Sequence, residues 1–265
     1  MIADRALVAR MDASLMDYWG TYGLAEGGRL EKLRDALFMQ TTIPHSLFNS
    51  VILSGHDPDA TETALGLGAE CARNAGVPVL WRVGPAADTA GLRARLEDAG
   101  LKPGEPHPAM LADLDDLDDM PTEPVIDGLV IKTAKGPEER RTWGRLTIAS
   151  FEMEESLGEA MGACEATIPP DMFGDQPRYT AYLDGEPVAV SSLVMTDGIA
   201  GIYAVATLPR ARARGIGTAM TLHAMAEGRR RGARMATLQA TSMGRPVYEK
   251  IGFRTIFDYQ TYLQA

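Results

Sequence analysis

Residues that could do chemistry gather in one stretch of the sequence, PRARARGIGT at 209–218. Three arginines alternate there with small residues and lead into Gly215 and Gly217, where a helix is expected to begin. The free N–H groups and the dipole of a helix start attract anions, and arginines are favourable there when an anion lies between them. Glycines let backbone N–H groups approach phosphate oxygens closely, and Thr218 adds a hydroxyl donor. The stretch therefore predicts a cradle for a polyphosphate.

Two common phosphate-binding patterns do not fit this loop. The Walker pattern requires GxxxxGK[ST], and no lysine follows these glycines. The dinucleotide fingerprint requires GxGxxG, and Met220 stands where its third glycine would be. An ATP-binding P-loop and a Rossmann turn are both disfavoured.

Two motifs resemble those of the GCN5-related N-acetyltransferase (GNAT) family. Residues 212–217, RARGIG, resemble the core of motif A, Arg/Gln-x-x-Gly-x-Gly/Ala, which in the family lies between a strand and a helix. Residues 246–253, PVYEKIGF, resemble the end of motif B, Tyr-Glu-x-x-Gly-Phe. The order of elements expected over 129–263 is also the family's order. The resemblance covers roughly half of the chain, and the first half could be a divergent second copy, as in tandem members.

The resemblance implies acetyl-CoA as cofactor and direct attack of a primary amine on the thioester. The pyrophosphate of coenzyme A would lie on backbone amides of the loop, and the pantetheine arm would add beside the preceding strand, as in β-augmentation. The residues implied to bind the cofactor are Val205, Ala206, Thr207, Arg212, Ala213, Arg214, Gly215, Ile216, Gly217 and Thr218.

Tyr248 aligns with the tyrosine that protonates the departing thiolate in the family. A thiol has a pKa of about 8.5 and a tyrosine of about 10, so this transfer is feasible where the thiolate is poorly solvated. The alternative is an ordinary half-buried tyrosine that only packs against its neighbours.

The general base is where the sequence departs from the family. Many members carry a glutamate on the strand before the loop, and Tyr203 stands at that position here. The base could be a chain of water molecules, or Glu152, Glu154 or Glu155 from an acidic run near residue 153. Such a run is more typical of a solvated face, and it could also attract a cationic amine.

The sequence thus indicates an acetyltransferase that acts on a small-molecule amine. One alternative is a non-catalytic acyl-CoA-binding or regulatory module, with which the missing strand glutamate is consistent. Another is a protein or peptide N-terminal acetyltransferase, which needs an open groove for its acceptor. Acceptor contacts lie on variable loops, so the motifs do not name the acceptor.

The elements that position these residues form an α/β (α+β) domain in the second half of the chain. A strand is expected at 129–133 and a helix at 136–151. Three strands are expected within 178–207, joined at Asp184-Gly185 and Asp197-Gly198, which favour two-residue hairpins. The remaining elements are a helix at 217–231, a strand at 234–240, a short helix at 244–252 and a strand at 254–263. Together they predict a mixed, mainly antiparallel sheet flanked by helices.

The first half repeats the order of elements of the last quarter. A helix at 61–76 is expected between strands at 47–54 and 77–83, and a helix at 90–101 and a strand through AMLADL, residues 109–114, follow. The acidic HDPDATET, residues 56–63, stands where the second half has its cationic loop. The acidic loop should bind no coenzyme A. The alternative to an internal repeat is that any two α/β segments look alike when only the order of their helices and strands is compared.

We therefore expect two related domains, a degenerate GNAT-like domain at 1–120 and a catalytic, acetyl-CoA-binding domain at 121–265. The break between them is LADLDDLDDMPTEP, residues 111–124. Its aspartates repel one another and its prolines cannot continue a helix, so a solvated linker is favoured over an acidic binding motif.

Composition narrows the classes of partner, the cellular compartment and the kinds of metal site that are expected. With 265 residues and a net charge of −10, the chain is not expected to bind nucleic acid or an anionic membrane, since both need a basic face. No apolar run is long enough to span a membrane, and the start lacks a signal-peptide pattern. Cys71 and Cys164 form no CxxC pair, which favours the cytoplasm. The four histidines show no metal-ligand spacing. The oligomeric state stays open, a homodimer included.

Overall fold

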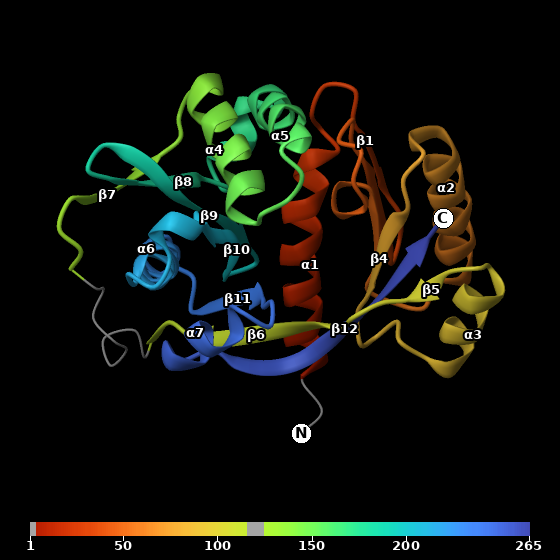
Figure 1. The fold of residues 1–265 in the computed structure, drawn as a ribbon. Helices are drawn as coiled ribbons and strands as arrows, with labels where there is room; N and C mark the ends of the chain where they lie inside the picture. Colours follow the sequence, from red (N-terminus) through yellow and green to blue (C-terminus); the bar gives the residue numbers. More distant parts are fainter. Residues whose placement is uncertain (1–3, 116–124) are drawn as a thin grey trace. The chain divides into compact units, whose positions relative to one another are not determined.

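The computed structural model describes residues 4–115 and 125–265, and the chain divides into two compact units (Figure 1). Unit 1 comprises Met1–Ala109 together with Ile256–Ala265, and unit 2 comprises Met110–Thr255. The chain therefore leaves unit 1 once and returns to it with residues 256–265.

The sheet of unit 1 is mixed. Its strands are β1 (Arg29–Lys32), β2 (Ala36–Gln40), β3 (Ser50–Leu53), β4 (Val79–Val83), the short β5 (Lys102–Pro103) and the greater part of β12 (Arg254–Gln264). β2 pairs antiparallel with β1 and β3, whereas β3 and β4 run parallel. β12 pairs antiparallel with β4 and with β5.

Helices pack on both faces of this sheet (Figure 1). They are α1 (Arg5–Tyr22), α2 (Pro58–Ala75) and α3 (Ala90–Asp98), with a 3-10 turn at Ser46–Phe48. Successive side chains of a strand point to opposite faces. In β2, Phe38 belongs to the apolar core beneath α2, whereas Leu37 lies against Gly20 of α1.

The sheet of unit 2 carries the motifs. Its strands are β7 (Leu129–Thr133), β8 (Arg178–Leu183), β9 (Glu186–Thr196), β10 (Ile199–Thr207) and β11 (Met235–Gln239), with the end of β6 (His107–Asp113) beside β11. β7 to β10 are antiparallel in chain order, and β11 joins β10 in parallel. The Thr237 hydroxyl of β11 donates to the Met110 carbonyl of β6 at 3.0 Å.

Four helices accompany this sheet. They are α4 (Pro137–Ser150), α5 (Ser156–Thr167), α6 (Ile216–Arg230) and the short α7 (Arg245–Lys250), with 3-10 turns at Pro170–Phe173 and Pro209–Ala211. α6 packs on one face, where Tyr179 and Ala181 of β8 enter its apolar core. Arg178 points to the other face and lies over the ring of Trp143 in α4, at 5.2 Å.

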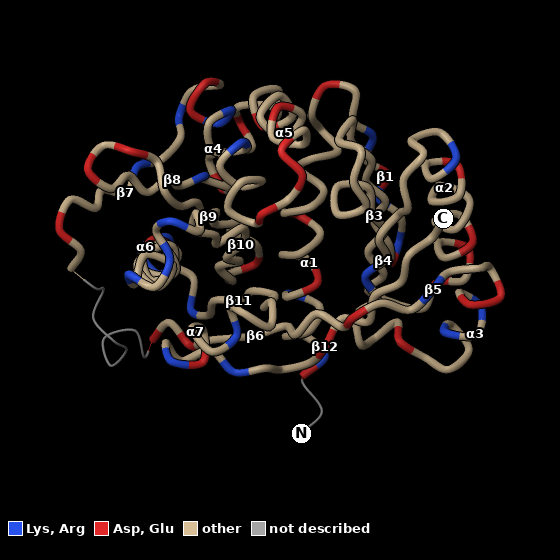
Figure 2. The backbone as a smooth tube through the Cα atoms, viewed as in Figure 1, with Lys and Arg blue, Asp and Glu red and all other residues tan. Residues whose placement is uncertain are grey.

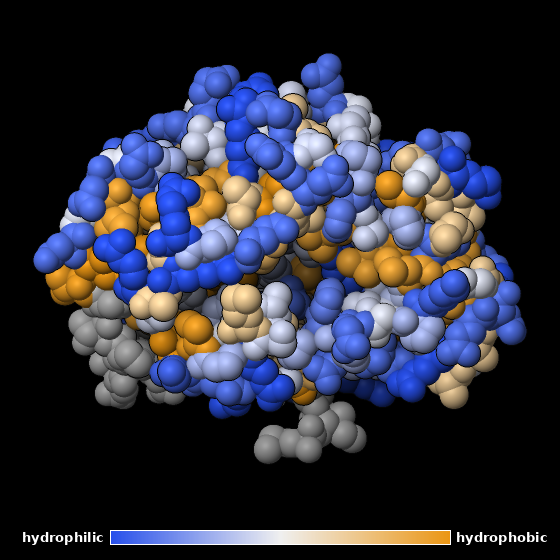
Figure 3. Space-filling model, viewed as in Figure 1, coloured by the Kyte–Doolittle hydropathy of each residue, from blue (hydrophilic) through white to orange (hydrophobic). Residues whose placement is uncertain are grey.

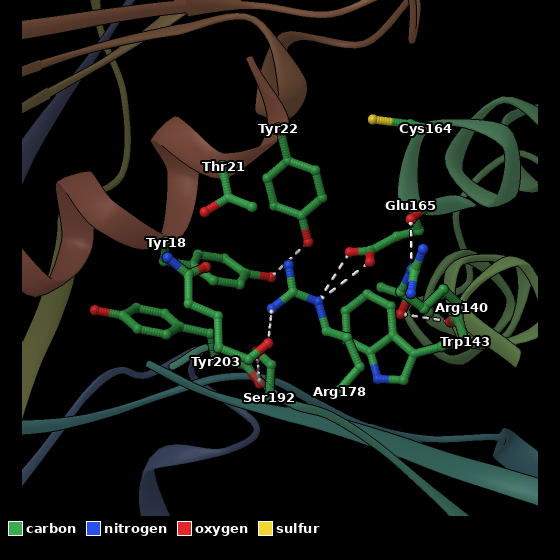
Figure 4. A network of polar contacts seen from close by, with 12 residues as sticks. Tyr18, Thr21, Tyr22, Arg140, Trp143, Cys164, Glu165, Arg178, Ser192 and Tyr203 are labelled. Atoms are coloured by element: carbon green, nitrogen blue, oxygen red, sulfur yellow. Dashed lines mark hydrogen bonds and ion pairs between the residues drawn. The ribbon is translucent and has the colours of Figure 1, made fainter. Parts of the chain in front are cut away.

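A buried ion pair ties α5 and α4 to β8 (Figure 4). Arg178 and Glu165 are fully buried, and the Arg178 Nε lies 3.0 Å from Oε1 of Glu165. Arg140 of α4 donates to the Glu165 carbonyl at 3.2 Å. Removing one partner of such a pair leaves an uncompensated buried charge, which is strongly destabilising. The pair therefore holds the two helices at one place on the sheet.

Most elements expected from the sequence are present. β7 forms at the expected residues, and the three strands of 178–207 turn at Asp184-Gly185 and Asp197-Gly198. The helices expected at 136–151 and 217–231 form as α4 and α6. The mixed, mainly antiparallel sheet flanked by helices is confirmed.

Three features differ from the expectation. α1, β1 and β2 were not foreseen. Residues 256–265 belong to unit 1 rather than to the second domain, because β12 pairs with β4. The first residues of the linker expected at 111–124 belong to β6, which forms where a strand was also expected at 109–114; residues 111–112 are buried, and residues 116–124 lie outside the described part of the chain.

Hydrophilic side chains cover most of the face seen in Figure 3, with apolar residues scattered between them. Cys71 in α2 and Cys164 in α5 are both buried free thiols. Across residues 4–115 and 125–265, no helix has the length and apolar character needed to cross a membrane.

Candidate active site

β10 and β11 pair over only part of their length. The parallel register joins residues 199–201 of β10 to residues 235–237 of β11. Farther along β10, the register with β9 shifts between Tyr203 and Ala206, and Ala204 has a φ of +51°. A bulge of this kind bends a strand and increases its twist. The second half of β10 therefore stays paired with β9 while it diverges from β11.

The loop after β10 has two residues in the left-handed region. Ala213 has a φ of +59° and Gly215 a φ of +81°. Glycine adopts this conformation freely, but alanine does so at a cost, and such strain is found where a loop is held for function. Left-handed residues within a turn bring successive backbone N–H groups to one side, as in anion-binding nests.

α6 begins after this loop with an uncapped first turn. Gly215 is its N-cap residue, and no side-chain cap bond forms there within the described structure. Outside the helix itself, the nearest atom to a Cβ built on Gly217 would be the Thr207 hydroxyl oxygen, at 3.9 Å. Free N–H groups beside open space at a helix start form an anion site.

The side chain of Arg212 is not available to an anion. Its Nε donates to the Thr207 carbonyl at 3.1 Å, and another guanidinium nitrogen donates to the Ser150 carbonyl at 2.8 Å. The third pairs with the Glu152 carboxylate at 2.6 Å. Other segments thus use all three nitrogens of the Arg212 side chain, and the cofactor contact expected of Arg212 is left to its backbone.

Arg210 and Arg214 remain as cations at this loop. Both side chains are exposed, and neither has an ion pair with any of the residues that the structure describes. Their charges therefore add to the positive potential of the helix start, while Arg212 contributes only its backbone.

Tyr248 lies in α7, which contacts α6. It is buried and belongs to the same apolar cluster as Ile216 and Met220 of α6. Its ring meets that of Phe253 edge-on, with the centroids 5.9 Å apart. Burial raises the pKa of the Tyr248 hydroxyl to about 12. The phenol therefore stays protonated across the physiological range.

The three glutamates considered as bases have different surroundings. Glu152 is the partner of Arg212 and has a φ of +53°. Glu154 accepts from the Ser156 hydroxyl at 2.6 Å, and Glu155 is the N-cap residue of α5. All three side chains are exposed on the connection between α4 and α5. Tyr203, at the position of the family's strand glutamate, is buried next to the bulge of β10.

Gln239 was missed by the sequence analysis. It is the last residue of β11, two residues beyond the point where β11 stops pairing with β10. Its Nε2 is buried and has no hydrogen-bond partner among the described residues. A buried amide donor without a partner is costly, so it marks a place where a ligand or water would complete the bonding. Its only signal in the sequence is a polar residue at the end of an apolar strand.

The matching place in unit 1 is built differently. β3 and β4 pair in parallel over all of β3, and the Gly84 N–H extends the ladder to the Leu53 carbonyl at 2.8 Å. The first turn of α2 is capped by Asp57, whose side chain accepts from the Ala60 N–H at 2.8 Å. Arg34 lies 3.4 Å from the same carboxylate. The Asp57 carboxylate thus occupies the first turn of α2, whereas the first turn of α6 in unit 2 has no side-chain cap.

Comparison with known proteins agrees with this geometry. Residues 145–253 match the family model described as the acetyltransferase (GNAT) family. The fold is similar to that of a GCN5-related N-acetyltransferase from Kribbella flavida, with 16% identity and a TM-score of 0.67 over 96% of this chain and 95% of that one. No curated protein matches the chain by sequence.

Two further solved structures have a similar fold. A GCN5-related N-acetyltransferase from Sphaerobacter thermophilus shares 19% identity, with a TM-score of 0.60 over 89% of this chain and 82% of that one. A tandem GNAT protein from the clavulanic acid biosynthesis pathway shares 13%, with a TM-score of 0.58 over 95% and 94%. At such identities the likeness shows the fold and not a shared substrate.

The family match runs from α4 through β10, the loop and α6 to Phe253, just beyond α7. It therefore contains the diverging strands, the uncapped helix start and Tyr248. Residues 145–253 match the family model of the GNAT acetyltransferases, and the chain as a whole has a fold similar to that of the GCN5-related N-acetyltransferases.

Proposed function

We propose that this protein transfers the acetyl group of acetyl-CoA to a primary amine of a small molecule, by direct attack of the amine on the thioester. The observation that carries the proposal is the pairing of a diverging β10 with an uncapped, cationic start of α6. An extended amide chain and a pyrophosphate need these two features next to each other.

The residues fit the cofactor at both ends of this arrangement. The backbone from Arg212 to Thr218 would hold the pyrophosphate, and Gly217 leaves the space that the phosphate oxygens require. Val205–Thr207, on the part of β10 that has left β11, would pair with the amides of the pantetheine arm. When bound, the cofactor supplies an acetyl group activated as a thioester.

Two further side chains have suitable chemistry. Tyr248 can donate a proton to a departing thiolate because burial keeps its phenol protonated. Ala236 and Leu238 of β11 point into the core with α6, so Gln239 points to the opposite face of the sheet. Its free donor suits an oxygen atom of a substrate that approaches from that face.

We assign catalysis to unit 2 and propose that unit 1 is a degenerate GNAT-like domain. Asp57 and the continuous β3–β4 ladder remove from unit 1 the two features that would hold coenzyme A. The likeness of the whole chain to a tandem GNAT protein supports this assignment.

The test measures binding and turnover on the purified chain. Titration with coenzyme A should show binding, and release of free thiol from acetyl-CoA should accelerate when small primary amines are added. Tight binding without turnover on any amine would favour the non-catalytic acyl-CoA-binding module. Turnover only on peptides with a free N-terminus would favour an N-terminal acetyltransferase. Absence of coenzyme A binding would refute the proposal.

A further inference from the structure

One side chain ties three segments of unit 2 together. The Arg212 guanidinium bonds to the carbonyl of Thr207 at the end of β10 and to that of Ser150 in the last turn of α4. It also pairs with Glu152, in the connection between α4 and α5. Figure 2 shows acidic residues along this connection. Arg212 itself stands in the loop that leads into α6.

The chemistry of these contacts is specific to arginine. The carbonyls of a last helical turn carry partial negative charge, so a cation at Ser150 is favourable. The planar guanidinium donates to two carbonyls and a carboxylate from three separate nitrogens in a fixed geometry, whereas the three donors of a lysine ammonium all lie on one nitrogen. The Arg212 side chain is partly buried, with 31% exposed, which restricts its rotamers.

Backbone strain lies on both sides of the contact. Glu152 and Ala213 both have positive φ values, +53° and +59°, although neither is a glycine. Residues held in this region persist only where their surroundings over-determine the conformation. Glu152 is itself a partner of Arg212, and Ala213 follows Arg212 in the chain, so the contact contributes directly to holding both.

We propose that Arg212 is a positioning residue that links the cofactor loop to the α4–α5 connection, so that coenzyme A held by the loop also stabilises residues 150–152. This inference rests on the proposed function, because it assumes that the loop binds coenzyme A. An anion that fixes the backbone at Arg212 also fixes the point from which its side chain reaches Ser150 and Glu152.

Linkage makes the inference quantitative. If binding of coenzyme A strengthens the contact between Arg212 and Glu152, then loss of the contact must weaken the binding of coenzyme A by the same factor. For a pair this exposed, the factor is up to about fivefold. Charge alone predicts the opposite effect, a lower Kd for coenzyme A. Removal of the Glu152 carboxylate favours an anionic ligand and frees a guanidinium nitrogen.

The experiment combines calorimetric titration of coenzyme A with hydrogen exchange in peptides covering 146–155 and 208–220. In the wild-type protein, coenzyme A should slow exchange in both segments. In Glu152→Gln, the slowing at 208–220 should remain, the slowing at 146–155 should shrink because only the bond to the Ser150 carbonyl is left, and the Kd should rise by up to about fivefold. Arg212→Lys keeps the charge but loses the planar guanidinium. It should change the exchange pattern in the same direction and raise the Kd for coenzyme A further.

Glu159→Gln is the matched control. It removes the same charge from an exposed pair with Arg145, at 2.7 Å, that joins α5 to α4 away from the loop. It should leave both the exchange pattern and the Kd as in the wild type. Tighter binding to Glu152→Gln, or slowing at 208–220 without slowing at 146–155 in the wild type, would overturn the inference. If coenzyme A slows exchange in neither wild-type segment, the proposed function fails and this inference fails with it.

Discussion

Tyr248 carries a single hydroxyl in an otherwise apolar cluster around the start of α6. Burial raises the pKa of that hydroxyl to about 12, because the anion would lose its solvation. A group of this kind is a poor base and a permanently available proton donor, which is the role that the proposed reaction requires of it.

Tyr248→Phe should lower kcat by about a hundredfold or more and leave the Kd of coenzyme A nearly unchanged, because it removes the proton donor and keeps the ring. Steady-state kinetics and titration measure the two effects. Tyr179→Phe is the control, since the Tyr179 hydroxyl is buried in β8 without a hydrogen bond to the described residues. Full activity of Tyr248→Phe would exclude the acid role.

Asp12 is a second residue whose charge is governed by burial. It lies in α1, and the Tyr259 hydroxyl of β12 donates to its Oδ1 at 2.7 Å. Burial raises the pKa of Asp12 from 3.8 to about 7, and the bond from Tyr259 only partly opposes this shift. Folded unit 1 therefore holds a proton that the unfolded chain releases between these pH values.

The free energy of unfolding should consequently fall as pH rises from about 4 to about 7, by up to about 4 kcal/mol from this group, and then level off. Asp12→Asn cannot ionise, so its stability should change less over the same interval. Denaturant unfolding at a series of pH values measures the two slopes. Equal slopes for wild type and variant would show that Asp12 is ionised throughout.

At the scale of elements, α2 and α6 are two helices that follow a strand in the same way and end at similar places. α2 supplies its own carboxylate, Asp57, to its first turn, whereas α6 starts at Gly215 with its N–H groups free. β3 stays paired with β4, but β10 diverges from β11. The two helix starts therefore differ by one capping residue, and the two strand pairs differ by one bulge.

Gly217→Val should raise the Kd of coenzyme A by more than about tenfold, since the added side chain enters the space that the phosphate needs. It should alter stability little, because the nearest atom outside the helix lies 3.9 Å from the new Cβ. Gly158→Val is the control, at an equally open position in the first turn of α5. An unchanged Kd for Gly217→Val would exclude this loop as the cradle.

Local signals explain which elements could be predicted from the sequence. The Asp-Gly turns at 184 and 197 fix both hairpins of unit 2, and Gly76 ends α2 in the left-handed conformation. α1 was missed because Asp12 and Ser14 lie on its buried face and interrupt the apolar stripe. β1, with the sequence RLEK, carries too few apolar residues to be recognised as a strand.

The site could be predicted only as far as its backbone. The glycines of the motif locate the helix start, but nothing in the pattern tells where the side chain of Arg212 points. Its partners Ser150 and Glu152 lie about sixty residues away in the sequence, and their proximity is a consequence of the folded sheet. The bulge at Ala204 is likewise invisible, since alanine gives no signal for a positive φ.

At the scale of the whole molecule, the two units together should bind a single cofactor. Calorimetry should give one coenzyme A per chain. Asp57→Ala should lower stability by about 1 kcal/mol through loss of the cap and should leave the stoichiometry at one, because the β3–β4 ladder remains closed. A stoichiometry of two in the wild-type protein would contradict the assignment of unit 1 as degenerate.

The path of β12 has a consequence for how the chain is made. Unit 1 includes residues 256–265, of which 260–264 pair with β4. This segment also brings Tyr259 to Asp12 and places the side-chain oxygen of Gln264 2.9 Å from the indole nitrogen of Trp81. During synthesis, domains generally fold in the order in which they leave the ribosome. Here the first unit to emerge has to wait for a strand that is translated after all of unit 2. Its exposed strand edge is therefore a liability throughout translation, and unit 2 has every opportunity to fold first.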